Sequence, residues 1–259
     1  MKITNFLALG ICLLFGSCTM QKSTVQVNDK GTEWEWNKGT IVVKTPERPA
    51  GQESVIGLAL PKMEVVRVGF VGLGMRGPGA VSRFTYIPGT QIVALCDYEK
   101  ERAEKCQKYL KEASLPKAAV YSGDKGYEEL CKRDDIDLVY IATPHSHHYL
   151  HAKMCLEAGK NVLCEKAFTV NADQARALFK LAEEKNLLIT EAIWTRYMPS
   201  RKMIDDIISS GVIGEVTAVT ANLNYAISEV ERIRKPELAG GALLDVGVYT
   251  INFASMVLG

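Results

Sequence analysis

The stretch that decides the fold is VVRVGFVGLGMRG, residues 65–77, in which an apolar β-branched run leads directly into three glycines. Gly72, Gly74 and Gly77 have the spacing G-x-G-x-x-G, where a buried strand would end and a helix begin. The first glycine permits a tight turn, the second lets the backbone approach a pyrophosphate, and the third allows close packing of helix on strand. The helix N-terminus then directs free N–H groups toward phosphate oxygens. The motif predicts a dinucleotide-binding unit.

A second apolar strand, QIVALCD, ends in Asp97, which lies 20 residues after Gly77. An acid at this position accepts hydrogen bonds from the adenosine ribose hydroxyls and repels a 2′-phosphate. We therefore expect NAD as the cofactor, with NADP as the less favoured alternative. A glycine-rich turn in an unrelated α/β protein is the other interpretation of the motif. Within the loop, Met75 and Arg76 are further candidate contacts of the cofactor.

Strands and helices alternate beyond this point. Helical patterns at residues 99–113 and 127–135 precede the strand IDLVYIAT, residues 136–143. This alternation implies right-handed crossovers and a parallel sheet, so the predicted fold class is α/β. In such a sheet, ligands bind at the carboxyl ends of the strands. All four histidines of the chain follow the last of these strands, in HSHHYLH, residues 145–151.

Composition limits the class of partner. The chain has 259 residues, of which 47% are hydrophobic and 24% charged, with a net charge of +1. A nearly neutral chain offers no basic field for nucleic acid, so we expect a small-molecule protein. Five of the seven cysteines lie beyond residue 18 and form no C-x-x-C pair, which argues against a disulfide framework and a structural zinc. We expect most of them to be small buried hydrophobes.

The N-terminus, residues 1–18, has one lysine, an apolar run and then small residues before Cys18. This pattern predicts a signal peptide, and its ending FGSC resembles the lipobox of bacterial lipoproteins. The expected product is an exported lipoprotein, anchored through lipid on Cys18 at the periplasmic or outer-surface side of the membrane. A buried N-terminal helix is the alternative. The polar residues 19–63 are expected to form a tether or an irregular surface extension.

From Val66 onward the chain resembles the Gfo/Idh/MocA family of nicotinamide-dependent oxidoreductases. ATPHSHH, residues 142–148, stands where the family reads A-T-P-N-x-x-H. AGKNVLCEKA, residues 158–167, matches A-G-K-x-V-x-x-E-K-P, with Ala167 in place of the proline. The resemblance implies a Rossmann NAD-binding domain over residues 64–193, followed by the start of an α+β substrate and oligomerisation domain.

Two branches of the family meet in this chain. Residues 33–143 resemble glycosyl hydrolase family 109, whose members use bound NAD to cleave N-acetylgalactosaminides. From Pro144 onward, motifs such as EAIWTRYMP and GGALLDVGVY resemble the dihydrodiol dehydrogenase branch. Residues 215–226 are expected to form the first strand of the antiparallel sheet that shapes the substrate pocket and the dimer interface of the family. Since the chain ends soon afterward, we expect a truncated member; a homo-oligomer is expected of full-length relatives and is doubtful for this chain.

The dehydrogenase branch implies the catalytic residues. Tyr249 matches its acid/base tyrosine, Lys166 matches the lysine that tunes this tyrosine and binds substrate, and Asp245 is expected to orient the substrate. A nearby lysine would lower the pKa of the phenol from its usual value of about 10. A solvated loop lysine and a half-buried aromatic are the alternative interpretations of Lys166 and Tyr249. Trp194 and Arg196 are expected to line the substrate pocket beside the cofactor, and packing of Trp194 in the core is the alternative.

The motifs together define the predicted cofactor contacts. They are Gly72, Gly74, Met75, Arg76, Gly77, Asp97, Thr143, Pro144, His145, His148, Glu165, Lys166, Trp194 and Arg196. No metal is expected, because no cysteine or carboxylate completes a ligand set with the histidines. Zinc bound by the histidine cluster is the alternative. His145 and His147 are expected in the turn before the helix, and His151 as a packed or solvated side chain.

Three functions follow as hypotheses. The first is an NAD(P)-dependent oxidoreductase that acts on a hydroxyl or carbonyl carbon of a sugar or cyclic diol. The second is a redox-assisted glycosidase resembling family 109, in which the sugar is oxidised, loses its aglycone by elimination and is reduced again. The third is a nucleotide-binding fragment without turnover.

Overall fold

The computed structural model describes residues 26–27, 33–37, 40–43 and 59–258. The predicted signal peptide and Cys18 therefore lie outside the described residues. The chain divides into two compact units, residues 1–57 and residues 58–259. Each unit is described by itself.

The first unit contains a small antiparallel sheet of three strands. They are β1 (Gln26–Val27), β2 (Glu33–Asn37) and β3 (Thr40–Val43), with Trp34 opposite Val43 and Asn37 opposite Thr40. The expectation of an irregular extension is wrong for these residues. The sequence EWEW alternates with a period of two and TIVV is rich in β-branched residues, and both patterns favour strands.

The second unit is built on a six-stranded parallel sheet in the order β6-β5-β4-β7-β8-β9. The strands are β4 (Val66–Val71), β5 (Thr90–Asp97), β6 (Ala119–Ser122), β7 (Leu138–Ile141), β8 (Asn161–Cys164) and β9 (Ile189–Glu191). Every neighbouring pair is parallel, which confirms the predicted α/β class. The strand order reverses between β4 and β7, so this is where the sheet opens a crevice for a ligand.

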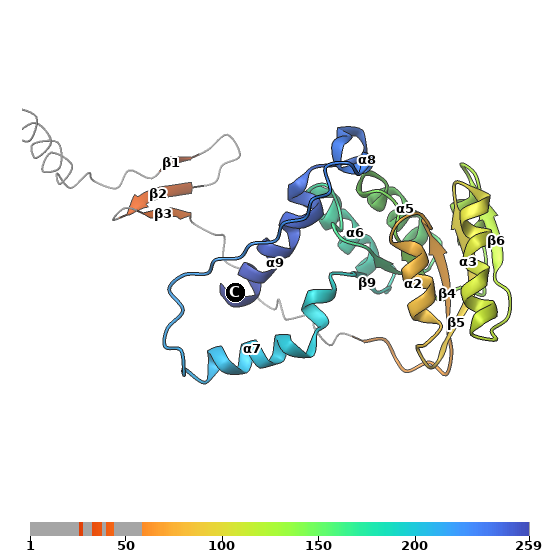
Figure 1. Ribbon diagram of the computed structural model, residues 1–259, viewed down its shortest axis with the longest axis horizontal. Coiled ribbons are helices and arrows are strands. Elements are labelled where there is room, and N and C mark those ends of the chain that lie inside the picture. The colour runs from red at the N-terminus through yellow and green to blue at the C-terminus, as the bar shows by residue number, and fades with distance from the viewer. Residues whose placement is uncertain (1–25, 28–32, 38–39, 44–58, 259) are drawn as a thin grey trace, which may run out of the picture. The chain divides into compact units, whose positions relative to one another are not determined.

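Helices cover both faces of this sheet (Figure 1). On one face are α2 (Gly77–Phe84) and α3 (Lys100–Glu112), and on the other are α4 (Gly126–Cys131), α5 (His145–Glu157) and α6 (Ala172–Glu184). Leu95 of the sheet packs with Val81 of α2 and Leu110 of α3 in one core. Ile141 packs with Leu156 of α5 in the other. Apolar burial on both faces accounts for the continuous β-branched strands of the sequence.

Helix α5 begins at His145, directly after Pro144, whose φ is −57°. The expectation that His145 and His147 lie in the preceding turn is therefore wrong. Proline fixes φ at a helix-compatible value and its missing N–H is not needed at a helix start, so the turn is shorter than expected.

The chain beyond β9 has a different character. Its elements are the 3-10 turn η1 (Trp194–Tyr197), α7 (Pro199–Ser209), α8 (Glu231–Arg234), the 3-10 turn η2 (Pro236–Leu238), the π-helical turn η3 (Leu243–Gly247) and α9 (Val248–Leu258). The strand expected at residues 215–226 is wrong: this segment pairs with no other strand in the described part of the chain. A strand needs a ladder partner for its N–H and C=O groups, and none is available there.

Among the described residues, one helical segment, Pro236–Leu258, is long and apolar enough by composition to cross a membrane; its most apolar 18-residue window has a mean hydropathy of 1.5 and is 11% buried. It contains Asp245, which is 4% exposed and forms ion pairs with Lys166 and Arg232. The Lys166 pair joins this segment to the turn after β8, and the Arg232 pair joins it to α8.

Candidate functional site

The glycine loop forms a tight cradle between β4 and α2. Gly72 has φ +92°, and its N–H donates to the Cys96 carbonyl at 2.9 Å. A Cβ on Gly72 would lie 2.6 Å from the Thr143 nitrogen, and one on Gly77 would lie 2.0 Å from the Gly72 carbonyl oxygen. Neither position has room for a side chain, as the motif requires for a close turn and for close packing of the helix.

Gly74 differs from the other two glycines of the loop. A Cβ built on it would meet only the Arg102 guanidinium, at 3.7 Å. The backbone at Gly74 is therefore open on its outer side, where a pyrophosphate would approach the N-terminus of α2. Met75, at 70% exposure, extends into solvent beside it. The cradle fits a dinucleotide.

Asp97 ends β5 and is buried. Its Oδ2 accepts a hydrogen bond from the Leu73 N–H at 2.6 Å, and its Oδ1 accepts one from the Glu99 N–H at 3.0 Å. The Arg102 Nη1 lies 3.6 Å from Oδ1. The carboxylate thus closes the glycine turn from the neighbouring strand, a structural role that the sequence did not reveal.

His148 is fully buried beneath the turns that follow β7 and β8. Its Nδ1 lies 2.7 Å from the Ala167 carbonyl and its Nε2 lies 2.9 Å from the Thr143 carbonyl. Burial lowers the pKa of His148 to about 4, so the neutral ring donates to one of these carbonyls at a time. The motif predicted His148 as a cofactor contact, but in the structure its ring is fully buried and both ring nitrogens face backbone carbonyls. His148 ties the Thr143–Pro144 turn to the Lys166–Ala167 turn, whose peptide bond is cis.

His145 and His151 make different contacts. His145 is buried and its Nδ1 donates to the Ala239 carbonyl at 3.2 Å, while burial lowers its pKa. Of the two alternatives for His151, packed or solvated, the structure shows a packed side chain: its Nδ1 lies 3.0 Å from the Thr143 hydroxyl and its ring centre lies 4.4 Å from that of Tyr127. No three His, Cys, Asp or Glu side chains among the described residues lie together as a metal-binding group.

Glu165 links the glycine loop to the centre of the sheet. It is buried, and its Oε1 accepts hydrogen bonds from the Tyr140 hydroxyl at 2.5 Å and from the Arg76 Nε at 2.9 Å. Burial raises the pKa of Tyr140 well above its ordinary value, so the phenol keeps its proton and donates. The ion pair holds the Arg76 side chain over the edge of the sheet, at the mouth of the cavity described next.

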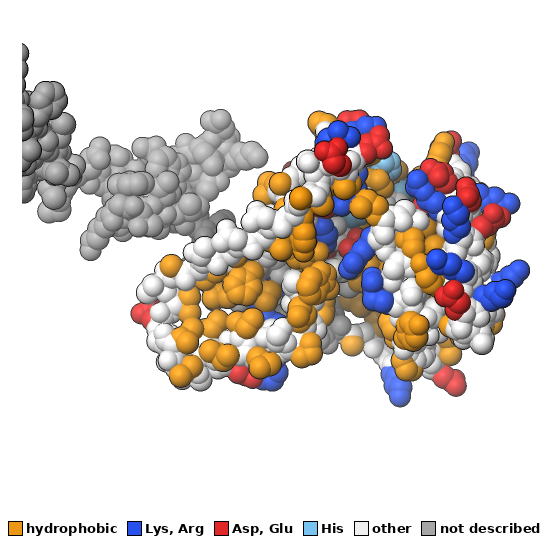
Figure 2. Space-filling model, in the orientation of Figure 1, with side chains coloured by type: hydrophobic (Ala, Val, Ile, Leu, Met, Phe, Trp, Pro, Cys, Tyr) orange, Lys and Arg blue, Asp and Glu red, His pale blue; other side chains and the backbone are white. Residues whose placement is uncertain are grey.

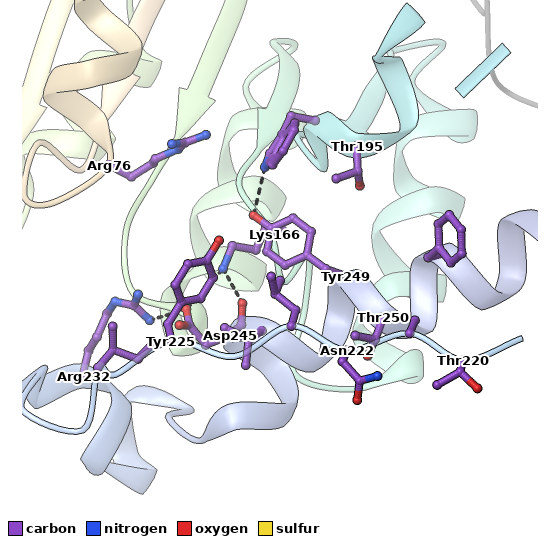
Figure 3. A pocket seen from close by; sticks show the side chains of 16 residues that line it. Arg76, Lys166, Thr195, Thr220, Asn222, Tyr225, Arg232, Asp245, Tyr249 and Thr250 are labelled. Carbon is purple, nitrogen blue, oxygen red and sulfur yellow. Dashed lines mark hydrogen bonds and ion pairs between the residues drawn. The ribbon is translucent and has the colours of Figure 1, made fainter. Parts of the chain in front are cut away.

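A cavity of about 670 Å³ opens at the carboxyl edge of the sheet, and Figure 3 shows the side chains that line it. They come from the glycine loop, the turn after β8, η1, the extended segment after α7, and the helices of the C-terminal segment. The charged and aromatic members that matter for chemistry are Arg76, Lys166, Trp194, Arg232, Asp245 and Tyr249. The fold therefore brings together residues that are more than 170 positions apart in the chain, from Arg76 to Tyr249.

Asp245 lies between two cations in this cavity. Lys166 Nζ donates to the Asp245 backbone oxygen at 2.6 Å and lies 3.2 Å from its Oδ1, while Arg232 Nη1 donates to the same Oδ1 at 2.8 Å. Burial alone would raise the pKa of the Asp245 carboxyl, but the Arg232 hydrogen bond and the Lys166 charge outweigh it and lower the pKa. Asp245 therefore stays ionised and contacts Lys166 and Arg232 while it lines the cavity, and its expected role in orienting the substrate stays a prediction.

Tyr249 points into the cavity beside Lys166, as Figure 3 shows. The Trp194 Nε1–H donates to the Tyr249 hydroxyl at 3.2 Å, and Lys166 Nζ lies 5.1 Å from the centre of the phenol ring. The expected lowering of the phenol's pKa is wrong: burial raises the pKa of Tyr249, against the opposing effect of the Trp194 bond. The lysine approaches the ring face and is held by Asp245, so it does not pair with the hydroxyl.

The remaining predicted residues divide between two outcomes. Trp194 lines the cavity as expected, at 49% exposure. Arg196 does not line it, because its Nε donates to the side-chain oxygen of Asn252 in α9 at 2.6 Å, with the amide turned to face it. Arg232 was missed. It lies beyond the segment that was interpreted as a strand, and nothing local in its sequence marks it.

Two family profiles match the chain. The profile described as an oxidoreductase family with an NAD-binding Rossmann fold matches residues 66–192, and the GFO/IDH/MocA C-terminal domain profile matches residues 202–259. The chain belongs to the Gfo/Idh/MocA oxidoreductase family. This confirms the family resemblance, the Rossmann fold and the identity of the C-terminal segment.

Curated relatives in the Gfo/Idh/MocA family include glycosyl hydrolase family 109 protein 4 of Phocaeicola vulgatus, 58% identical over 217 residues. That match covers 83% of this chain and 42% of the relative. Family 109 protein 1 of Bacteroides thetaiotaomicron is 55% identical over 145 residues, or 56% of this chain and 31% of the relative. The chain thus spans less than half the length of these relatives. From the sequence motifs, the resemblance to family 109 covers residues 33–143. A match over 217 residues is too long to end at residue 143, so the likeness to family 109 continues past Pro144.

Among solved structures, the chain is similar to a 3-ketoreductase from Actinomadura kijaniata in complex with NADP and TDP-benzene. The TM-score is 0.64 and the identity 30%, over 75% of this chain and 58% of that one. The assignment of the second half to the dihydrodiol dehydrogenase branch stays a prediction.

Proposed function

We propose that the unit formed by residues 58–259 binds NAD in the glycine loop and supports hydride transfer to or from a carbinol carbon of a carbohydrate or cyclic diol. The observation that carries the proposal is the convergence of Lys166, Tyr249 and Trp194 at the carboxyl edge of the sheet, in one cavity with Arg76 from the glycine loop. Nicotinamide, when bound, supplies the hydride chemistry. The residues of this chain supply the proton and hold the substrate oxygen.

Tyr249 is the proposed proton donor. Indole N–H is a donor only, so the Tyr249 oxygen accepts from Trp194 and its own O–H proton remains available for a substrate oxygen. Because burial raises the pKa of the phenol, Tyr249 is protonated at neutral pH. This state suits reduction of a carbonyl, whereas oxidation of an alcohol requires the phenolate and should accelerate as the pH rises.

Lys166 is the proposed ligand of the same substrate oxygen. Its ammonium carries three protons, of which the Asp245 backbone oxygen and carboxylate take up two. The third is free to stabilise negative charge that develops on a substrate oxygen beside Tyr249. Asp245 and Arg232 keep Lys166 in place and are positioning residues.

The choice of NAD over NADP is supported by charge. A 2′-phosphate at the end of β5 would meet the carboxylates of Asp97 and Glu99, with which Arg102 is already paired. NAD is therefore expected to bind more tightly than NADP, and Asp97→Asn, which keeps one of the two side-chain oxygens that accept from the Leu73 and Glu99 N–H groups, should narrow the difference. Calorimetric titration with both dinucleotides measures this; equal affinity in the unaltered protein would contradict the proposal.

The catalytic proposal is tested with the purified chain, NAD, and a panel of sugars and diols, following the absorbance of the reduced nicotinamide. Tyr249→Phe should lower kcat by about 100-fold or more while NAD affinity changes little. Tyr197→Phe is the matched control, since Tyr197 is exposed and its hydroxyl bonds only to Thr190. If NAD does not bind, or if Tyr249→Phe turns over like the unaltered protein, the proposal is wrong.

A redox-assisted glycosidase is the second candidate, and the 58% identity to a family 109 relative favours it. In this chemistry the sugar carbon is oxidised, the glycosidic bond breaks by elimination, and the hydride returns, so no reduced cofactor accumulates. Release of nitrophenol from a nitrophenyl N-acetylgalactosaminide without net reduction of NAD would support this candidate. Net reduction without nitrophenol would support the first, and dinucleotide binding with neither would indicate a binding unit without turnover.

The export proposal depends on the sequence of residues 1–18 alone. We propose that Cys18 receives a lipid after removal of the signal peptide. Expression in a bacterium followed by membrane fractionation should place the protein in the membrane fraction, and Cys18→Ser should release it. Recovery of the unaltered protein in the soluble fraction of the cytoplasm would contradict the proposal.

A further inference from the structure

We propose that Cys131 and Cys155 form a thiol–disulfide exchange site, in which a small disulfide oxidant converts the two thiols into a bond between α4 and α5. Cys131 is the last residue of α4, and Cys155 lies near the end of α5. Their sulfur atoms are 3.3 Å apart, within hydrogen-bonding contact of thiols. This site is separate from the cavity at the carboxyl edge of the sheet.

Packing keeps the two sulfurs together. Cys131 is 4% exposed and Cys155 is 1% exposed, and both belong to the core on the α4, α5 and α6 face of the sheet. The sulfurs therefore approach each other without a large backbone movement, as formation of a disulfide of ordinary length requires. The other three described cysteines have no such close sulfur partner among the described residues.

A second cavity gives a route from solvent to one member of the pair. It has a volume of about 270 Å³ and lies between α4 and α5, with Cys131, Glu128, Lys132, Met154 and Glu157 among its lining residues. Cys155 does not line it. An external disulfide can thus reach Cys131 from this cavity, whereas Cys155 is not accessible from it.

The two thiols are also chemically unequal. Cys131 and Cys155 share a hydrogen bond in which either sulfur can be the donor; this bond lowers the pKa of Cys131 despite its burial, with the Lys160 charge acting in the same direction. The same bond and complete burial raise the pKa of Cys155. Cys131 is therefore the better thiolate nucleophile, and it is the one that the cavity exposes.

The exchange proceeds in two balanced steps. The Cys131 thiolate attacks one sulfur of the oxidant, forms a mixed disulfide and releases the first half of the oxidant as a thiolate. The Cys155 sulfur then loses its proton to that thiolate or to water, attacks the Cys131 sulfur and releases the second half. Two protein thiols are oxidised, and one external disulfide is reduced to two thiols.

Equilibration of the full chain with mixtures of oxidised and reduced glutathione tests the proposal, followed by alkylation and peptide mapping of each cysteine. The expected result is a linked pair of peptides that carry Cys131 and Cys155, with Cys96, Cys106 and Cys164 alkylated. The oxidised protein should melt roughly 5 °C higher than the reduced one, because a link across 24 residues restricts the unfolded chain. Cys106→Ser, on the other face of the sheet, is the matched control and should form the same link.

Single variants separate the roles of the two thiols. Cys155→Ser should accumulate glutathione on Cys131, whereas Cys131→Ser should leave Cys155 unmodified. A stable mixed disulfide on Cys131 in the unaltered protein, or both thiols remaining reduced when oxidised glutathione is in large excess, would overturn the proposal. The peptide map of the unaltered protein decides the question even where a variant fails to fold.

Discussion

Within the second unit, the Rossmann part (residues 59–193) and the C-terminal segment (residues 194–258) are stabilised by different kinds of interaction. Every buried hydrophobic side chain of the described residues lies between Val68 and Ile193. After Ile193, the buried side chains are Asp245 and Asn252, and both are polar. Figure 2 shows the corresponding surface, where hydrophobic side chains gather over α7 and α9. Met203 of α7 is 63% exposed and Ile251 of α9 is 58% exposed.

This difference shows how catalytic residues are positioned without a core of their own. The C-terminal segment contacts the Rossmann part through the Lys166–Asp245 pair and the His145–Ala239 bond, while the Trp194–Tyr249 bond lies within the C-terminal segment. Directional polar contacts fix a side chain at the site, while contributing less stability than apolar burial. We therefore expect the stability of the unit to depend on the Rossmann part and its chemistry to depend on the polar contacts between the two.

The largest expected effect tests the glycine cradle. Gly77→Ala places a Cβ about where it would overlap the Gly72 carbonyl, at 2.0 Å, so α2 must move. We expect unfolding free energy to fall by roughly 4 kcal/mol and dinucleotide binding to be lost. Gly74→Ala is the control: its Cβ has room, so stability should hold while NAD affinity falls because the pyrophosphate approach is obstructed. Denaturant unfolding measures the unfolding free energy and calorimetry measures NAD affinity. An equal loss of stability in both variants would show that the close contact at Gly77 does not cause the destabilisation.

A pair of apolar truncations tests the comparison directly. Leu156→Ala removes a fully buried side chain of α5 and should cost about 3 kcal/mol of unfolding free energy. Ile251→Ala removes a side chain of α9 that is 58% exposed and should cost less than about 0.5 kcal/mol. Chemical denaturation of both proteins provides the measurement. Similar losses for the two variants would mean that the C-terminal segment has an apolar core after all.

Removal of the central carboxylate tests the polar contacts. Asp245→Asn leaves Lys166 and Arg232 without their shared counter-charge and should cost about 2 kcal/mol, with earlier proteolysis after Ile193. NAD affinity should be retained, because the glycine loop does not contact Asp245. Asp206→Asn, which breaks an exposed pair with Lys202, should leave both measurements nearly unchanged. Limited proteolysis that is identical in the two variants would show that Asp245 does not hold the segment.

The smallest expected effect is a pH dependence within the Rossmann part. Burial lowers the pKa of His151 to about 4, below its value of roughly 6.5 in the unfolded chain. The unfolded chain therefore binds a proton that the folded protein does not, and stability falls as the pH drops from about 6.5 toward 4. We expect His151 to contribute about 1 to 2 kcal/mol of this loss. His151→Gln should flatten the curve of unfolding free energy against pH by that amount, and an unchanged curve would contradict the burial effect.

The carboxyl edge of the sheet could be predicted because its signals are local. Three signals mark this edge: a strand followed by spaced glycines, an acid at the end of the next strand, and the turn before Lys166. Each of them is contained in a few neighbouring residues. The roles of Asp97 and His148 could not be predicted from the same signals. Both were expected to face a ligand, and both turn out to accept or donate hydrogen bonds to backbone groups of neighbouring turns. A sequence position at a strand end does not specify which way a side chain points.

By itself, the sequence determined the parallel α/β architecture, the dinucleotide cradle and the family, since hydrophobic periodicity and glycine spacing act over short distances along the chain. Only the tertiary structure decided which charges meet. Cys131 approaches Cys155 because α4 and α5 pack on the same face of the sheet. Arg232 pairs with Asp245, and Trp194 bonds to Tyr249, because the chain beyond Ile193 brings separate turns and helices together. The tertiary structure also reversed the direction expected for the pKa shift of Tyr249, which is upward instead of downward. Burial of the phenol causes this shift, and burial cannot be deduced from neighbouring residues in the chain.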